Sequence, residues 1–99
     1  MYVGALTLDV LLGDVRSLKQ KRSVVRPIVA ELVRRFPVSA AETGHQDKYR
    51  RAEIGVAVVS GDGGHCRDVL EACERLVAAR PELDILSVRH RVYDSADDD

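Results

Sequence analysis

The spacing of apolar residues constrains this chain most, because it switches between two periods within only 99 residues. Apolar side chains at alternate positions predict strands with one buried face over residues 2–12, 53–60 and 83–93. A helical period of about 3.6 residues runs from Leu18 to Phe36, and again from Asp62 to just before Pro81. The short mixed segment 38–43 predicts one further strand. The order along the chain is therefore strand, helix, strand, strand, helix, strand.

This βαββαβ order is the split βαβ or ferredoxin-like arrangement, an α+β fold. Right-handed crossovers place both helices on one face of a four-stranded antiparallel sheet. The length is that of one domain, which we expect to span residues 1–93. Four acids among the last six residues predict an acidic, disordered tail over residues 94–99.

Both helices carry start signals. Ser17 is a good N-cap, and Gln20 three residues later completes a capping box. Asp62 lies among glycines and is a good N-cap for the second helix. Pro27 falls inside the first helical pattern, and we expect it to kink that helix near Ser23, because the proline ring clashes with that carbonyl group.

Two cysteines, Cys66 and Cys73, lie seven residues apart on the apolar face of the second helix. A rise of about 10 Å over that spacing rules out a disulfide within one regular helix, so we expect reduced thiols in the core. The chain shows no signal peptide pattern and no apolar run of the roughly 18–20 residues needed to span a bilayer. We therefore expect a cytoplasmic protein that contacts no membrane.

The overall charge of −1 hides a strongly polarised chain. Residues 16–51 contain ten Lys or Arg and three acids, a balance of +7, whereas residues 52–99 have a balance of −6. Lys19, Arg22 and Arg26 recur at helical spacing just after the N-cap, with Arg16 close by. Such a block favours a polyanionic partner, because each neutralised phosphate releases counterions. A solvated basic face without a partner is the alternative interpretation.

The segment from Gly44 to Arg51 mixes three cations with His, Gln, Asp and Tyr side chains. This mixture suits single-stranded or irregular RNA, which proteins recognise by stacking and polar contacts. We therefore predict a non-enzymatic protein that binds RNA or a ribosomal particle and uses neither a metal nor a cofactor. The residues expected to contact RNA are Arg16, Lys19, Lys21, Arg22, Arg26, His45, Gln46, Lys48, Arg50 and Arg51.

The same loop supports a second hypothesis, a small-ligand regulator or an enzyme of unknown reaction. It would use Glu42, His45 and Asp47, together with Ser60 and Asp62 at other strand ends. Catalysis would require Glu42, His45 and Asp47 to converge within hydrogen-bonding reach in a pocket. His45 and Asp47 alone are a weak metal signal, because no second cluster of ligands has suitable spacing.

The sheet face away from the helices is a further candidate surface, because its central residues Val3, Ala5, Ala57 and Val59 are small and apolar. Burying such a face favours association by ~25 cal/mol per Å² of apolar area, and closed two-fold dimers are the commonest solution. We therefore predict a homodimer through this face. Charged residues around the rim favour a monomer instead: Asp9, Glu53, Arg89 and Arg91.

Several motifs that follow one another in order carry a family resemblance: Val3-Gly4, Ser17–Val24, Arg35–Ser39, Ala41-Glu42, His45–Asp47, Arg51-Ala52, Gly55–Ser60 with Asp62, His65 and Val69–Glu71. With these motifs the chain resembles the YlxP-like family of small bacterial proteins of unknown function, across roughly Tyr2 to Tyr93. Pro27 and Gly44 depart from the commonest pattern of that family, where a helix former and an acid often stand.

The resemblance implies a ferredoxin-like fold, in agreement with the order of strands and helices. Genes of this family often neighbour genes for translation initiation and ribosome maturation, which implies an RNA- or ribosome-associated role. The resemblance implies no enzymatic reaction, because none is established for the family.

Overall fold

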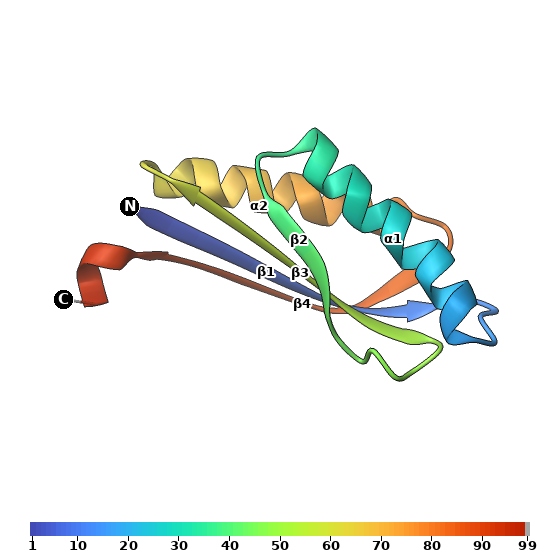
Figure 1. The fold of residues 1–99 in the computed structure, drawn as a ribbon. Coiled ribbons are helices and arrows are strands. Elements are labelled where there is room, and N and C mark those ends of the chain that lie inside the picture. Colours follow the sequence, from blue (N-terminus) through green and yellow to red (C-terminus); the bar gives the residue numbers. More distant parts are fainter. Residues whose placement is uncertain (99) are drawn as a thin grey trace.

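Four strands and two long helices follow one another in the expected order in a computed structural model, which describes residues 1–98 (Figure 1). The prediction of a βαββαβ chain is therefore confirmed. The elements are β1 (Tyr2–Leu12), α1 (Leu18–Arg35), β2 (Ser39–Gly44), β3 (Arg51–Ser60), α2 (Gly63–Ala78), β4 (Leu83–Asp94) and a short 3-10 helix, η1 (Ser95–Asp98).

The strands form one antiparallel sheet in the order β2-β3-β1-β4, with β1 and β3 at its centre. Ala5 of β1 is paired with Ala57 of β3 on one side and with Arg91 of β4 on the other. Both helices cover the same face of the sheet (Figure 1). This is the ferredoxin-like arrangement, and it leaves the opposite face of the sheet, which we call the open face, without a covering element.

The core lies between the sheet and the two helices. Leu6, Leu8, Val10 and Leu12 of β1 are at most 1% exposed, so the predicted alternation is confirmed. Each such side chain contributes about 1.5–3 kcal/mol when fully buried. The helices contribute most of the remaining buried side chains: Val25, Ile28 and Leu32 from α1, and Cys66, Val69, Leu70, Cys73 and Val77 from α2.

One residue of the predicted apolar pattern is exposed in the structure. Val33 belongs to the apolar pattern of the first helix, but it is 49% exposed because α1 turns that position away from the sheet. Cys66 and Cys73 are both buried free thiols, as expected.

Among residues 1–98, no helix has the length and apolar content that a membrane-spanning helix needs.

The helix caps form much as predicted. The Ser17 side chain accepts a hydrogen bond from the Gln20 backbone N–H at 3.1 Å. The Gln20 side chain reaches back to the Arg16 N–H at 2.6 Å, one residue before the position that a standard capping box uses. Asp62 accepts from the first N–H groups of α2, as an N-cap should. Helix α1 continues through Pro27 over its full 18 residues.

Secondary structure continues into the segment that the sequence predicts to be an acidic tail. Strand β4 extends to Asp94, one residue into the predicted tail, and the backbone of Ser95–Asp98 forms the 3-10 helix η1. The N–H of Ser95 donates to the carbonyl of Met1 at 2.9 Å, and the Met1 ammonium lies 3.7 Å from Asp94. These contacts hold the end of β4 against the start of β1. Asp99 of the predicted tail lies outside the described residues.

Two register shifts interrupt the sheet at the same end of the molecule. One falls between Glu42 and Gly44 in the β2–β3 ladder, and the other between Asp9 and Val10 in the β1–β4 ladder. Such irregularities bend a strand and redirect its side chains. Thr43 lies at the first of these shifts, just before the β2–β3 loop, residues 45–50, which carries many of the candidate site residues.

Candidate functional site

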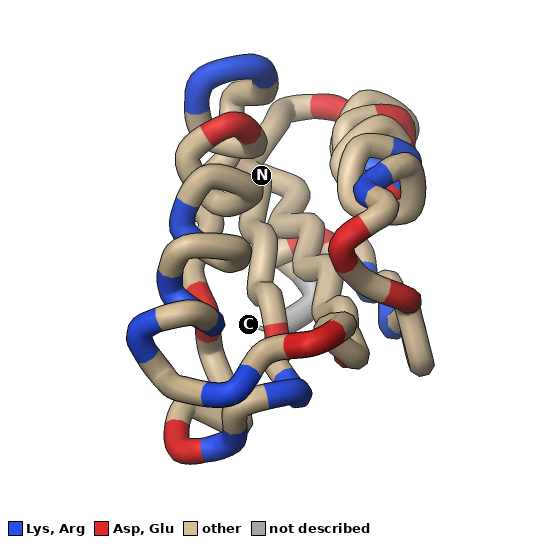
Figure 2. Tube along the Cα trace, turned by 90° about the vertical axis from the view of Figure 1, so that its right-hand side faces the viewer, with Lys and Arg blue, Asp and Glu red and all other residues tan. Residues whose placement is uncertain are grey.

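Two basic segments that are distant in the sequence meet at one end of the molecule, which we call the basic end (residues 16–26 and 45–51). The Arg50 backbone accepts from the Leu12 N–H at 2.8 Å, and Arg50 Nε donates to the carbonyls of Leu12 and Gly13 at 3.2 and 2.9 Å. Lys21 of α1 donates to the carbonyl of His45. In Figure 2, the blue Lys and Arg stretches gather along α1 and the β2–β3 loop.

Most of the predicted cations at this end are exposed to solvent. Lys19, Arg22 and Arg26 form a stripe along α1 and make no hydrogen bond or ion pair within residues 1–98. Arg16 Nε lies 3.2 Å from Asp14 Oδ1 in a largely exposed ion pair, which contributes little to stability. The exposed cations of the basic end are Arg16, Lys19, Arg22, Arg26, Lys48 and Arg50.

The prediction that Lys21 contacts RNA is wrong, because its side chain is only 1% exposed. Its ammonium Nζ lies 2.8 Å from Glu42 Oε2 and donates to the His45 carbonyl. The helical spacing contained this signal, since Lys21 falls on the buried stripe between Leu18 and Val25. The long aliphatic stem of lysine lets the residue fill such a position while its charge finds a partner.

The Lys21–Glu42 pair joins α1 to the end of β2. Glu42 Oε2 is fully buried and has no partner in hydrogen-bond geometry, so its contact with Lys21 is an ion pair alone. Removing two charges from water is costly, and their attraction offsets that cost only when both partners are present. The pair therefore fixes the position of the β2–β3 loop relative to the basic stripe of α1.

A second charged cluster lies on the open face beside this loop. Arg51 makes a two-point contact with Asp9, with Nη2 2.5 Å from Oδ2 and Nε 3.3 Å from Oδ1. His45 Nε2 lies 3.6 Å from Asp9 Oδ1. Because Asp9 balances the charge of Arg51, this predicted RNA contact adds little net positive charge. The role of Asp9 depends on the register of β1 and β3, which the sequence pattern does not specify.

His45 has an unusual backbone. Its φ of 57° lies in the left-handed region, and it is the one non-glycine residue with positive φ that the described residues contain. Left-handed backbone is uncommon outside glycine and is found often at functional sites. Here it turns the His45 carbonyl toward Lys21 and the imidazole toward Asp9. The residue thus connects the buried ion pair to the open-face cluster.

The side chains of the enzyme hypothesis do not converge. Glu42 points toward Lys21 on the helix side, whereas His45 lies near Asp9 on the open face. Asp47 is exposed and contacts neither of them. Asp62 caps α2, and Ser60 accepts from the Asp62 N–H. Among residues 1–98, no three His, Cys, Asp or Glu side chains are grouped so that they could hold a metal ion.

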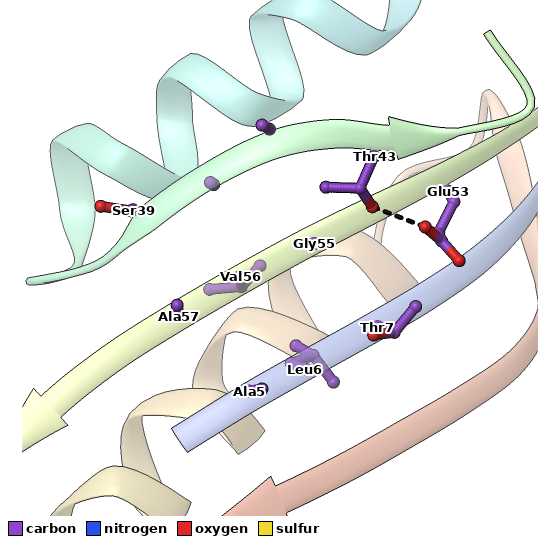
Figure 3. Close-up of a pocket in the computed structure, with 11 residues that line it drawn as sticks. Ala5, Leu6, Thr7, Ser39, Thr43, Glu53, Gly55, Val56 and Ala57 are labelled. Atoms are coloured by element: carbon purple, nitrogen blue, oxygen red, sulfur yellow. Dashed lines mark hydrogen bonds between the residues drawn. The ribbon is translucent and has the colours of Figure 1, made fainter. Parts of the chain in front are cut away.

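A shallow trough of about 460 Å³ crosses the open face between β1, β2 and β3 (Figure 3). Its floor is made of small residues, among them Ala5, Gly55 and Ala57. Thr43 Oγ1 donates to Glu53 Oε2 at 2.7 Å at one end of the trough. A side chain at Gly55 would place its Cβ 2.8 Å from a Thr43 methyl carbon, so any larger residue would force the Thr43 side chain to move.

The sheet order and the single helical layer define the class of this protein: a small ferredoxin-like α+β domain whose polar chemistry gathers at one end. The family described as "Protein of unknown function (DUF503)" matches residues 3–90. The chain belongs to this family, so the family resemblance expected from its motifs is confirmed.

The chain is similar to one bacterial protein in sequence and to one designed protein in fold. The chain is 29% identical over 82 residues to "Uncharacterized protein YlxP" of Bacillus subtilis (strain 168), a match that covers 83% of this chain and 89% of that protein. It is also similar to a de novo designed protein with a ferredoxin fold solved by solution NMR, with a TM-score of 0.55 and 12% identity. That match covers 96% of this chain and 88% of the designed one, and it shows the fold alone.

Proposed function

We propose that this protein binds RNA, alone or exposed on a ribosomal particle, through its basic end and without catalysing a reaction. The observation that carries the proposal is the stripe of Lys19, Arg22 and Arg26, three exposed cations with no partner within residues 1–98. Beside it stand the exposed Lys48 and Arg50 of the β2–β3 loop.

The electrostatics of the stripe support a polyanionic partner. Like charges three and four residues apart destabilise a helix by a few tenths of a kcal/mol per pair. RNA phosphates bound to the stripe would neutralise these charges and remove the repulsion. The counterions that the RNA releases on binding add to the affinity. The free N–H groups at the start of α1 also favour an anion there.

The remaining polar groups of the basic end have distinct roles in this proposal. Gln46 is exposed, although its Nε2 donates to the Glu42 carbonyl at 3.2 Å, and its side-chain oxygen is the group left to accept a hydrogen bond from a base or a ribose. Tyr49 is 51% exposed and offers a ring for stacking. His45 and Arg51 pair with Asp9, so they support the loop more than they bind RNA.

Fluorescence anisotropy with ribosomal RNA fragments and 30S particles tests this proposal. Lys19→Ala combined with Arg22→Ala should weaken binding at least tenfold. The matched control, Arg67→Ala combined with Arg75→Ala, removes two exposed cations from α2 and should change binding less than twofold. Absence of binding at 50 mM salt, or equal losses in both double variants, contradicts the proposal.

The salt dependence provides a second measurement. Six exposed cations at the basic end allow about five or six phosphate contacts. With a slope of about 0.7 per phosphate for single strands, affinity should fall by roughly two orders of magnitude between 50 and 200 mM salt. An affinity that does not change with salt over this range contradicts binding through these cations.

A further inference from the structure

A cavity of about 460 Å³ lies between α1 and the end of β2, on the helix side of the sheet and apart from the open-face trough. Its volume falls within the range of roughly 300–1,000 Å³ typical of small-molecule sites. Val25, Val29 and Ala30 of α1 provide an apolar floor. Such a floor suits a flat, weakly polar group, which excludes a bare phosphate as the whole ligand.

One side of the cavity is strongly cationic. Arg22 and Arg26 line it from successive turns of α1, and both guanidinium groups lack any partner among residues 1–98. A guanidinium group binds phosphate through two parallel hydrogen bonds, and its plane also stacks on aromatic rings. Two such groups beside an apolar floor match a ligand that combines a phosphate with a ring.

The opposite side supplies hydrogen-bonding groups. Glu42 lines the cavity, and its negative charge is balanced by the buried ammonium of Lys21 at 2.8 Å. The Glu42 side chain is 22% exposed although Oε2 is buried against Lys21, so only the remainder of the side chain is open to a ligand. Gln46 also lines the cavity. These two side chains can accept from the amino or imino group of a nucleobase edge.

We propose that this cavity binds a single unstacked nucleotide, with the base on the apolar floor and the phosphate on Arg22 and Arg26. The base edge faces Glu42 and Gln46, which favours guanine, whose imino and amino groups both donate, over uracil, whose edge has a single N–H. This inference rests on the proposed RNA binding when the nucleotide belongs to an RNA strand, and it deepens it by adding a site for one unpaired base. A free mononucleotide has the same chemistry and is the other source of the ligand.

Filling the cavity without changing any charge tests the inference. Ala30 is exposed on α1, so Ala30→Phe and the milder Ala30→Leu should fold and occupy the floor. Ala30→Phe should weaken the binding of a 12-nucleotide single strand at least about fivefold, the low end of what one stacked base contributes. Ala30→Leu should give a smaller loss. Binding of a 12-base-pair RNA duplex should change less than twofold, because its bases are not available.

The matched control places the same substitution on the other helix. Ala78→Phe alters the exposed end of α2 and should leave single-strand binding within twofold of the parent protein. Equal losses in Ala30→Phe and Ala78→Phe, or a loss for duplex RNA as large as for the single strand, overturn the inference. The proposed RNA binding survives that outcome if Lys19→Ala with Arg22→Ala still weakens both RNAs.

NMR titration with guanosine monophosphate, uridine monophosphate and inorganic phosphate separates the sources. We expect guanosine monophosphate to shift the amide signals of Val25, Val29, Ala30 and Gln46 more than uridine monophosphate, and Ala30→Phe to abolish these shifts. If mononucleotides bind in this way but no RNA does, the cavity is a free-nucleotide site and the proposed function is wrong. If no nucleotide shifts these signals and single-strand binding is unchanged by Ala30→Phe, the inference is overturned.

Discussion

A lysine with a side chain that is 1% exposed depends on its partners, and Lys21 has two of them, the Glu42 carboxylate and the His45 carbonyl. Both partners belong to the segment that ends β2 and begins the β2–β3 loop. The side chain therefore links the helix that carries the basic stripe to the loop that carries the other exposed cations. The Lys21 ammonium group therefore stabilises the fold and is not available to bind a partner at the surface.

Replacing Lys21 by methionine should lower the free energy of unfolding by about 3 kcal/mol, because the Glu42 carboxylate loses the charge that balances it. Methionine keeps most of the aliphatic volume, so the loss reports the ion pair. Lys19→Met, on the exposed side of the same helix, should change stability by less than about 0.5 kcal/mol. Urea unfolding followed by circular dichroism measures both, and equal effects would contradict the structural role of Lys21.

The double variant Lys21→Met with Glu42→Leu should recover most of that loss, since a buried ion pair can often be replaced by apolar residues of similar volume. A double-mutant cycle then gives the coupling between the two side chains. Additive losses would show that the two residues stabilise the fold independently of each other.

Cys73 makes stability depend on pH in the alkaline range. Burial raises the pKa of its thiol from 9.0 to about 11. Between these values the unfolded chain loses the thiol proton while the folded chain retains it, so stability is fully present below pH 9 and falls as pH rises toward 11. One pKa unit corresponds to about 1.4 kcal/mol, so the loss should approach 2–3 kcal/mol.

Urea unfolding between pH 8 and pH 11 measures this effect. Cys73→Ala should be less stable at pH 8, because it leaves a small cavity, but its stability should fall less steeply above pH 9. Other groups titrate in the same range, and the difference between the two curves removes their shared contribution. Parallel curves for the two proteins would contradict the prediction.

At the scale of elements, helix α1 contains an exposed proline in its middle. Pro27 has no N–H, so the carbonyl of Ser23 loses its usual helical partner. Pro27→Ala should raise the free energy of unfolding by about 1–3 kcal/mol, because alanine restores that hydrogen bond and removes the ring clash.

Pro37→Ala is the matched control, since Pro37 follows the end of α1 and is also exposed. It should change the free energy of unfolding by less than about 1 kcal/mol. The same urea unfolding experiment compares the two variants. A Pro27→Ala protein less stable than its parent would contradict the prediction and would show that the packing of α1 requires the proline.

The elements could be predicted from the sequence because their signals are local. Alternation over residues 2–12 and the caps at Ser17 and Asp62 depend only on neighbouring residues, and both are confirmed. The site could be predicted only in part. A lysine in an apolar stripe can snorkel outward or find a buried partner, and only the position of Glu42 decides between them. The Arg51–Asp9 contact likewise depends on strand register.

At the scale of the whole molecule, the basic end and the open face are different surfaces. The open face has small residues at its centre, and Val59 and Tyr93 are exposed at one end, at 64% and 36%. Within one copy, Arg89 Nη2 lies 3.8 Å from Glu53 Oε1, and the Arg91 guanidinium lies over the Tyr93 ring, so these charged side chains already have partners. A two-fold axis parallel to the strands would bring the small apolar centres of two copies together, and the burial of apolar area favours that contact.

We therefore propose a homodimer through the open face. Ala57→Glu should shift it to a monomer, because a carboxylate would be buried without a partner at the centre of the contact. Ala78→Glu on α2 adds the same charge away from the sheet and should leave the dimer intact. Sedimentation equilibrium at micromolar concentration measures the mass. A monomer in the parent protein, or a dimer that Ala57→Glu leaves unchanged, contradicts this arrangement.

The hydrogen bond from Ser95 to the Met1 carbonyl has a practical consequence for engineering. The start of β1 and the end of β4 lie side by side, at the opposite end of the molecule from the basic end (Figure 1). A short flexible linker could join these two ends, and new termini could be opened in the exposed β2–β3 loop. Such a circular permutant would keep the core and the sheet order but cut the loop that carries Lys48. Its stability and its binding of RNA could then be measured separately, to show whether binding needs an intact loop.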